Sequence, residues 1–270
     1  MQRVGNPPGR TAAFPFTVPA IRTLEEVDLS GAVTFFVGEN GSGKSTVLEA
    51  IASLASLPAV GSAEVSSDVT LALQRSLTTG FRLVWNKRTR RGFFLRAEDF
   101  FGFVKRLARM RTELTDRLNE VERDFADASD HARGLAAGPA RASLAELTAR
   151  YGQNLDANSH GETFLRLFRT RLVPGGLYLM DEPEAALSPK SQLGLLALIA
   201  ETVAQGGQFV IATHSPILLA FPGAVIYSFD ALPIARTDYA DLEHVNLTRA
   251  FLTQPERYLR HLLEPAPEPD

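Results

Sequence analysis

The stretch VTFFVGENGSGKSTVLEAIASLA, residues 33–55, decides the fold of this chain of 270 residues. It opens with an apolar run at residues 33–37, passes through a glycine-rich segment, and ends with apolar residues at spacings of three and four. A short run of valine and phenylalanine predicts a strand, whereas those spacings predict a helix. The stretch therefore predicts a strand, a glycine-rich loop and a helix in direct succession.

The glycine-rich segment fits the phosphate-binding pattern G-x4-G-K-[ST], in the strand-to-helix context that this pattern requires. Glycines let backbone N–H groups converge on phosphates, and the following helix offers its positive end. In such a loop the lysine reaches the β- and γ-phosphates, and the next hydroxyl ligates Mg²⁺. We therefore expect ATP and Mg²⁺ as ligands. The candidate residues are Gly38, Asn40, Gly41, Ser42, Gly43, Lys44, Ser45 and, for the α-phosphate, Thr46.

A second apolar run, at residues 177–180, ends in the acids Asp181 and Glu182. Open α/β sheets place their sites at the carboxyl ends of the strands. There Asp181 can hold Mg²⁺, directly or through water, and Glu182 is placed to activate the attacking water. The alternative interpretation is a pair of solvated acids.

The rest of the chain predicts an α/β fold with a mostly parallel sheet flanked by helices. Further strands are expected at residues 209–213 and 225–229. Short apolar runs at residues 69–73, 81–85 and 93–96 predict an antiparallel side sheet, with the last two joined by a basic turn.

A helical insertion is expected at residues 99–157, within a core formed by residues 1–98 and 158–263. Its first helix, to about residue 133, is amphipathic, and a break at Gly134–Pro139 precedes a smaller helix at residues 143–151. The Pro-rich tail, residues 264–270, is expected to be disordered.

The composition excludes several kinds of site and argues against membrane insertion. The chain has no cysteine, which excludes disulfides, thiolate metal sites and a cysteine nucleophile and favours the cytoplasm. No apolar run approaches the ~18 residues that cross a membrane, so no membrane insertion is expected.

Residues 82–111 carry ten lysines and arginines against two acids, a charge of +8 in a chain of net charge −3. Such a region is either a solvated face or a surface for DNA or RNA.

Three motifs together resemble the P-loop ATPases of the ABC class, also called AAA family ATPases, and in particular their soluble SMC/RecF-like branch. The motifs are Gly38 to Thr46, Asp181-Glu182-Pro183-Glu184, and Ala212-Thr213-His214-Ser215-Pro216. The resemblance implies an ATP hydrolase in which two copies sandwich two ATP molecules. The insertion is too short for a long coiled coil, because a helix of about 25 to 30 residues reaches only about 40 Å. The chain is thus similar to a compact, stand-alone head.

The resemblance also implies roles for residues outside the first two motifs. His214 would sense the γ-phosphate, and Ser159 and Gly161 would form the signature loop that completes the partner's site. Ser159 also starts a Ser-x-x-Glu capping box, which is the alternative interpretation of this segment. His160 stands where the family has glycine, and Ser188 stands where transporter subunits have aspartate.

The residue near Mg²⁺ and the residue that stacks on the adenine each have two candidates. The family places a glutamine near Mg²⁺ after the strand at residues 93–96, and here Glu98 is the first stand-in and Gln74 the second. The adenine would stack on Phe14 or Phe16, although such aromatics are more often buried.

The sequence predicts a cytoplasmic ATP-driven switch that dimerises on ATP and acts on nucleic acid or on a separately encoded protein effector. The resemblance also implies possible roles for such a switch in DNA repair and genome defence. Two alternatives stay open: the nucleotide-binding subunit of an ABC transporter, and a low-turnover scaffold or toxin-control subunit.

Overall fold

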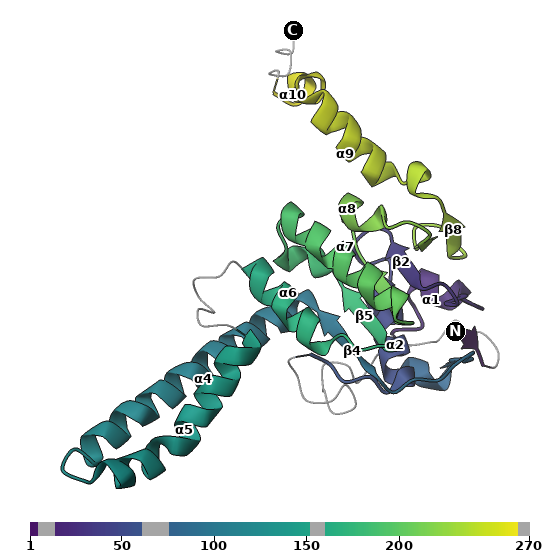
Figure 1. The fold of residues 1–270 in the computed structure, drawn as a ribbon. Coiled ribbons are helices and arrows are strands. Elements are labelled where there is room, and N and C mark those ends of the chain that lie inside the picture. The colour runs from purple at the N-terminus through teal and green to yellow at the C-terminus, as the bar shows by residue number, and fades with distance from the viewer. Residues whose placement is uncertain (5–13, 61–75, 152–159, 264–270) are drawn as a thin grey trace.

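A six-stranded sheet, ordered β4-β5-β6-β2-β7-β8, forms the centre of the computed structural model, which describes residues 1–4, 14–60, 76–151 and 160–263 (Figure 1). Every neighbouring pair is parallel except β7 and β8. This confirms the predicted α/β fold with a mostly parallel sheet. The strands are β2 (Val33–Val37), β4 (Gly92–Arg96), β5 (Leu177–Asp181), β6 (Gln208–Ala212), β7 (Val225–Ser228) and β8 (Ala235–Thr237).

Helices cover both faces of this sheet, and two helical segments project from it (Figure 1). The α-helices are α1 (Pro19–Thr23), α2 (Lys44–Ala55), α4 (Ala97–Asp124), α5 (Asp130–Tyr151), α6 (His160–Arg171), α7 (Pro189–Ala204), α8 (Pro216–Leu219), α9 (Glu243–Thr253) and α10 (Pro255–Leu263). Short 3-10 turns are η2 (Ser76–Thr79), η3 (Pro183–Ala186) and η4 (Tyr239–Asp241). No helix in the described ranges is long and apolar enough to span a membrane.

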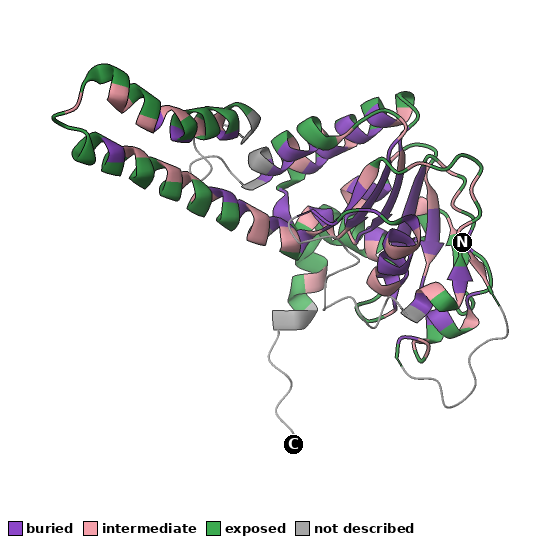
Figure 2. Ribbon diagram, turned by 90° about the horizontal axis from the view of Figure 1, so that it is seen from below, coloured by how far each residue is buried: buried purple, intermediate pink, exposed green. Residues whose placement is uncertain are grey.

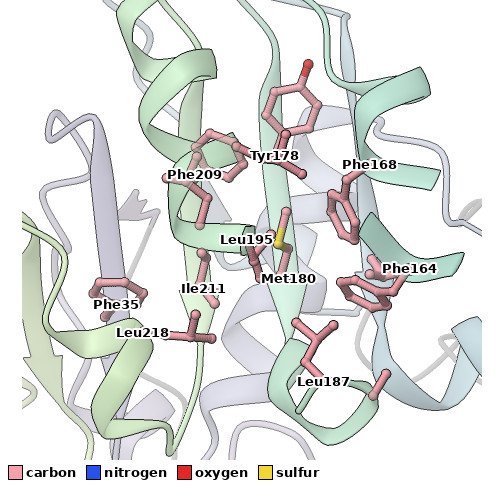
Figure 3. Close-up of a cluster of buried hydrophobic side chains, with 14 of the residues drawn as sticks. Phe35, Phe164, Phe168, Tyr178, Met180, Leu187, Leu195, Phe209, Ile211 and Leu218 are labelled. Carbon is pink, nitrogen blue, oxygen red and sulfur yellow. The ribbon is translucent and has the colours of Figure 1, made fainter. Parts of the chain in front are cut away.

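The core is divided by the sheet into two apolar clusters. Phe36 of β2 packs with α2 residues in one cluster, whereas its neighbour Phe35 belongs to the other. Figure 3 shows the second cluster, in which Tyr178 of β5 lies between Phe209 of the adjacent strand β6 and Phe168 of α6. All five residues of β2 are buried, and Figure 2 shows the central strands largely in purple. Burial on both faces explains why this strand has a continuous apolar run.

The structure contains an antiparallel side sheet, as predicted, but strand β4 does not belong to it. Strand β4 pairs in parallel with β5 at the edge of the main sheet, whereas the β3 strand (Phe81–Arg82) pairs antiparallel with β1 (Gln2–Arg3). The expected hairpin between residues 81–85 and 93–96 was therefore wrong. The physical reason is that β4 has three consecutive buried apolar residues and so needs cover on both faces. The strand expected at residues 69–73 lies outside the described residues.

The helical insertion forms an antiparallel hairpin of α4 and α5 that extends away from the sheet (Figure 1). The chain reverses at residues 125–129, and α5 continues through Gly134 and Pro139. The predicted break at Gly134–Pro139 was therefore wrong. Ala137 and Ala140, on either side of the proline, are buried, so burial of small side chains offsets the hydrogen bond that proline cannot make.

A cluster of charged side chains lies where α2, β4 and α4 meet. The Arg96 guanidinium donates to Asp99 through Nε at 2.8 Å and Nη2 at 3.2 Å, and its Nη1 lies 3.5 Å from Glu49 Oε1. The Arg96 and Glu49 side chains are only 13% and 8% exposed. Burial raises the pKa of Glu49 to about 7, against the opposing effect of Arg96.

Gly92 gives a direct test of the parallel register of β4. Its φ is +125°, and a Cβ at this position would lie 1.7 Å from the Leu177 carbonyl oxygen. Gly92→Ala should lower the free energy of unfolding by about 3 kcal/mol or more, because both the backbone and the strand pair must shift. Gly102→Ala is the matched control. Apart from its chain neighbours and the backbone of its own helix, no described atom lies within 4 Å of a Cβ at Gly102, and the helix should gain about 1 kcal/mol. If Gly92→Ala and Gly102→Ala changed the free energy of unfolding in urea equally, the parallel register of β4 would be contradicted.

Glu49 should make stability pH-dependent. Its folded pKa, about 7, exceeds the ordinary 4.5, so the folded chain holds a proton that the unfolded chain has lost between these values. Stability should therefore fall as pH rises from about 4.5 to about 7, by up to about 3 kcal/mol. Between pH 5 and pH 8, urea unfolding without metal or nucleotide should show a smaller loss of stability in Glu49→Gln than in the wild type. Asp181, whose pKa burial also raises, to about 6, accounts for the loss that remains.

The matched control is Glu201→Gln, on the exposed face of α7, which should follow the wild-type pH profile. A Glu49→Gln profile parallel to the wild type would show that the buried carboxyl does not titrate as expected.

Candidate active site

The three sequence motifs meet at one edge of the sheet because the strands that precede them are neighbours. Strand β2 leads into the glycine-rich loop, β5 ends at Asp181, and β6 leads to Thr213 and His214. Asp181 lies opposite Ala212 in the β5–β6 register, and Phe36 lies opposite Ala212 in the β2–β6 register. The carboxyl ends of the three strands are therefore level.

The glycine-rich loop folds around Lys44, the first residue of α2. Lys44 Nζ donates to the carbonyls of Gly38 at 2.6 Å and Glu39 at 2.9 Å, and its side chain is buried. Burial lowers the pKa of Lys44, while Glu182 and other acids oppose the shift. Gly43 has a φ of +104°, and a Cβ there would meet Val18 at 2.8 Å. Glycine at this position thus lets the loop close against the segment before α1.

Asp181 and Ser45 form the second part of the site. Ser45 Oγ donates to Asp181 Oδ1 at 3.1 Å. Burial raises the pKa of Asp181 to about 6, and the Ser45 hydrogen bond opposes the shift. A carboxylate and a hydroxyl are oxygen ligands of the kind that Mg²⁺ prefers, and a cation would offset the buried negative charge. The donor set therefore fits a magnesium ion that is shared with a phosphate.

Glu182 and His214 face each other beyond Asp181. His214 Nε2 lies 3.9 Å from Glu182 Oε1, and the two side chains are 39% and 46% exposed. Glu182 has a φ of +49°, which is strained for a residue with a side chain, and its N–H donates to the Ala212 carbonyl at 2.9 Å. This strained residue thus stands between β5 and the η3 turn.

Three further residues belong to this site, although the sequence analysis gave them no role there. Glu184 Oε1 accepts the backbone N–H of His214 at 2.7 Å, and Asp230 Oδ1 accepts that of Glu39 at 2.8 Å. The His244 ring of α9 lies 6.4 Å from the His214 ring, between centroids. Asp230 follows β7, so its place at a strand end was a usable signal. His244 lies beyond the strand motifs, and no sequence pattern connects it to them.

The remaining candidate residues are not placed among the charged groups of the site. Ser159 and Gln74 lie outside the described residues. Gly161 is buried in the first turn of α6, beside Ser191 of α7. The Glu98 side chain is 77% exposed and lies 3.6 Å from Arg96 Nε. Of the two aromatic candidates, Phe14 is exposed, whereas Phe16 packs against the core.

The phosphate-loop residues differ in exposure. Asn40 and Gly41 at the tip are exposed, Ser42, Ser45 and Thr46 are half-buried, and Gly38 is buried. Ser42 Oγ has no hydrogen-bond partner among the residues that the structure describes. The exposed tip and this unpaired hydroxyl leave room for an incoming acceptor such as a phosphate oxygen.

Two curated proteins are similar to this chain. Identity to the macrolide export ATP-binding/permease protein MacB of Photorhabdus laumondii subsp. laumondii is 25% over 216 residues, which cover 78% of this chain and 31% of MacB. Identity to the hemin import ATP-binding protein HmuV of Nocardia farcinica is 27% over 206 residues, which cover 73% of this chain and 63% of HmuV. The chain therefore spans about a third of the length of MacB.

A solved Smc head domain from Pyrococcus furiosus, bound to the C-terminal domain of ScpA, is also similar in part. The match has a TM-score of 0.38 and 11% identity, and it covers 84% of this chain and 93% of that one.

Two family models match the chain. One, described as "AAA domain", matches residues 18–125, which include the glycine-rich loop. The other matches residues 85–220, just over half of the chain, and includes Asp181, Glu182 and His214. The chain belongs to the family of this second model, described as "AAA domain, putative AbiEii toxin, Type IV TA system", and it is an ABC-class P-loop ATPase.

Proposed function

We propose that the chain binds ATP with Mg²⁺, hydrolyses it, and acts as a cytoplasmic switch in which two copies meet head to head. The observation that supports this most is the meeting of Lys44, Asp181 and Glu182 at neighbouring strand ends. Each carries the chemistry that phosphoryl transfer needs: a cation for the phosphates, a metal ligand and a base.

Lys44 binds the β- and γ-phosphates in this proposal, exchanging its bonds to the loop carbonyls for phosphate oxygens. Backbone N–H groups of the loop, with Asn40 and Ser42, orient the phosphate chain, and Thr46 contacts the α-phosphate. Ser45 and Asp181 hold Mg²⁺. When bound, Mg²⁺ neutralises negative charge on the β- and γ-phosphates.

Glu182 is the general base. Its carboxylate accepts a proton from a water molecule, whose oxygen bonds to the γ-phosphorus while the bond to the β–γ bridging oxygen breaks, giving ADP and phosphate. His214, held through its backbone N–H by Glu184, donates to the γ-phosphate and keeps Glu182 in place. Glu98 is the proposed outer contact of the metal, through water.

A second copy would close the site. The Glu182 and His214 side chains are both more than a third exposed, so in one chain the attacking water is open to solvent. The start of α6, which includes Gly161, is the proposed element that covers the partner's γ-phosphate, because a helix N-terminus favours negative charge. Ser159, which precedes α6 in the sequence, is the second proposed donor.

The switch would act through a separately encoded protein effector or through nucleic acid. Lys87, Arg88, Arg90 and Arg91 are exposed before β4, and Lys105, Arg106 and Arg109 are exposed on α4. Arg96, by contrast, is nearly buried and paired with acids, so it adds nothing to the basic surface. The exposed cations favour binding of phosphate backbones.

A transporter subunit is the second candidate function, because the relatives MacB and HmuV carry names of export and import proteins. In that function the chain would bind a membrane permease, and the helical hairpin would face it. Affinity purification of the tagged chain from its own cells distinguishes the two: a co-purifying permease supports the transporter role.

Glu182→Gln tests the proposed catalysis. ATP hydrolysis should fall by about 100-fold or more, because the amide cannot accept the proton of water. ATP binding should remain, so a dimer should accumulate in size-exclusion chromatography with light scattering. The control Glu201→Gln, on the exposed face of α7, should hydrolyse ATP at the wild-type rate.

Unchanged hydrolysis in Glu182→Gln would remove Glu182 as the base. A monomer that persists with ATP bound would instead contradict the head-to-head dimer and leave catalysis untouched.

Replacement of Arg88, Arg90 and Arg91 by Glu tests the basic surface. Binding of a DNA or RNA oligonucleotide should weaken at least tenfold, and the slope of log affinity against log salt should fall by about two to three. Replacement of the exposed Arg249, Arg257 and Arg260 of α9 and α10 by Glu changes the charge equally and should have little effect. Equal binding by the two triple variants and the wild type would exclude residues 88–91 from nucleic-acid binding.

A further inference from the structure

A cavity of about 500 Å³ lies at the edge of the sheet opposite the candidate active site. It is bordered by Gly31, Gly176 and Gly207, which precede β2, β5 and β6. Because glycine has no side chain, these residues leave the space open. The volume is in the range of sites that bind small ligands. The phosphate loop lies at the carboxyl ends of the same strands, so a ligand in this cavity would not compete with a nucleotide there.

Trp85 forms an apolar wall of the cavity, and it is the only tryptophan in the chain. The side chain is half-buried and packs against the core cluster that includes Val27 and Leu177. The core therefore holds the indole in place while part of it lines the cavity. An aromatic ring that is fixed in this way is a platform on which a flat ring of a ligand can stack.

The segment that contains this tryptophan is strongly basic. Residues 85–91 read WNKRTRR, and Lys87 and Thr89 also line the cavity. Thr89 Oγ1 accepts the backbone N–H of Arg91 at 3.1 Å, and the Arg91 carbonyl accepts the N–H of Leu177 at 2.9 Å. The basic segment is therefore folded into a turn and tied to the start of β5, beside the cavity.

The charges around the cavity favour an anionic ligand over a cationic one. The two acids in its lining already have partners: Asp28 pairs with Arg236 at 2.7 Å, and Glu26 accepts from Gln2 Nε2 at 3.3 Å. By contrast, three exposed cations of the basic segment form no ion pair with any residue that the structure describes: Lys87, Arg88 and Arg90. An anion can therefore bind these cations without displacing a partner within the described residues.

A nucleic acid offers both flat rings and a chain of phosphates. In a duplex, each base is paired and stacked between its neighbours, so its face is not available to an aromatic side chain. In a single strand, a base can leave its stack and rest on an aromatic ring while phosphates contact nearby cations. A basic surface alone would instead favour the duplex, which has the higher charge density. The cavity therefore fits an unpaired base.

We propose that the cavity binds an unpaired base of a single-stranded nucleic acid, which stacks on Trp85 while Lys87, Arg88 and Arg90 bind the flanking phosphates. This inference rests on the proposed binding of nucleic acid by the basic segment, and it adds the form of the nucleic acid and the site of its base. DNA and RNA share this chemistry, so both are used in the test.

The single tryptophan makes the test direct, because fluorescence excited selectively over tyrosine comes from Trp85 alone. The full chain, without nucleotide, is titrated with a DNA strand of about twelve nucleotides, with RNA of the same sequence, and with the DNA strand annealed to its complement. A single strand should quench the fluorescence and bind at least about fivefold more tightly than the duplex. Quenching by either DNA or RNA supports the proposal, and the tighter of the two identifies the preferred strand.

Trp85→Leu keeps an apolar side chain against the core but removes the stacking surface. In fluorescence anisotropy with a labelled strand, its affinity for the single strand should fall at least about fivefold, with duplex affinity within about twofold of the wild type. Trp85→Phe, which keeps an aromatic ring, should retain most of the affinity. Phe251→Leu is the matched control, because this aromatic residue is 36% exposed on α9, and it should bind as the wild type does.

Three results would overturn the proposal and leave the basic surface standing: a single strand that binds without quenching, a duplex that binds more tightly than the single strand, or wild-type affinity for the single strand in Trp85→Leu. If Trp85→Leu does not fold, the first two results decide. If the wild type binds neither strand nor duplex, the proposed nucleic-acid role falls, and this inference with it, whereas the ATP-driven switch is tested separately by Glu182→Gln.

Discussion

Strands β5, β6 and β2 lie next to one another in a parallel register, and the candidate site depends on this alignment more than on any other feature. Asp181 and Phe36 both lie opposite Ala212, so the residues that follow each strand emerge at one level. A slip of one residue in either pair would turn every side chain of the slipped strand to the other face of the sheet. The buried cores on both faces oppose such a slip, so packing far from the site sets the positions of its charged groups.

The same packing places charges where water solvates them poorly. Burial lowers the pKa of Lys44 and raises the pKa of Asp181 and Glu49, three groups on or beside α2. Each shift means that the charged form is less stable than in water. A triphosphate with a divalent cation would supply opposite charge to both Lys44 and Asp181. The site is therefore better matched to a charged ligand than to solvent, which is the arrangement expected of a preorganised phosphate site.

The sequence was most informative where function and local structure use the same residues. Gly43, Lys44 and Ser45 form a pattern because a loop that binds phosphate and turns into a helix tolerates few alternatives. The pairing of β4 was not predictable in this way, since its apolar residues fit a hairpin as well as a buried edge strand. The reversal of the hairpin at residues 125–129, rather than at Pro139, depends on burial of alanines against α4, which a single sequence does not encode visibly.

The sequence also did not predict the residues that position other residues. Glu184 and Asp230 act on backbone N–H groups, and such contacts require no particular residue type beyond an acceptor. Arg96 belongs to the basic region by its place in the sequence, whereas in the fold its side chain lies beside three acids. Only the fold distinguishes a cation on the surface from one that holds two helices together.

Two projecting segments begin beside the site, and they are held differently. Helix α4 begins at a bidentate ion pair that is largely closed to water, whereas α9 approaches through the buried Val245 and a ring contact between His244 and His214. Rotation of α4 relative to the sheet must break or carry with it two charge-assisted hydrogen bonds, whereas rotation of α9 disturbs the apolar packing of Val245 and the ring contact. A displacement at the strand ends is therefore transmitted more rigidly to the hairpin than to the C-terminal helices.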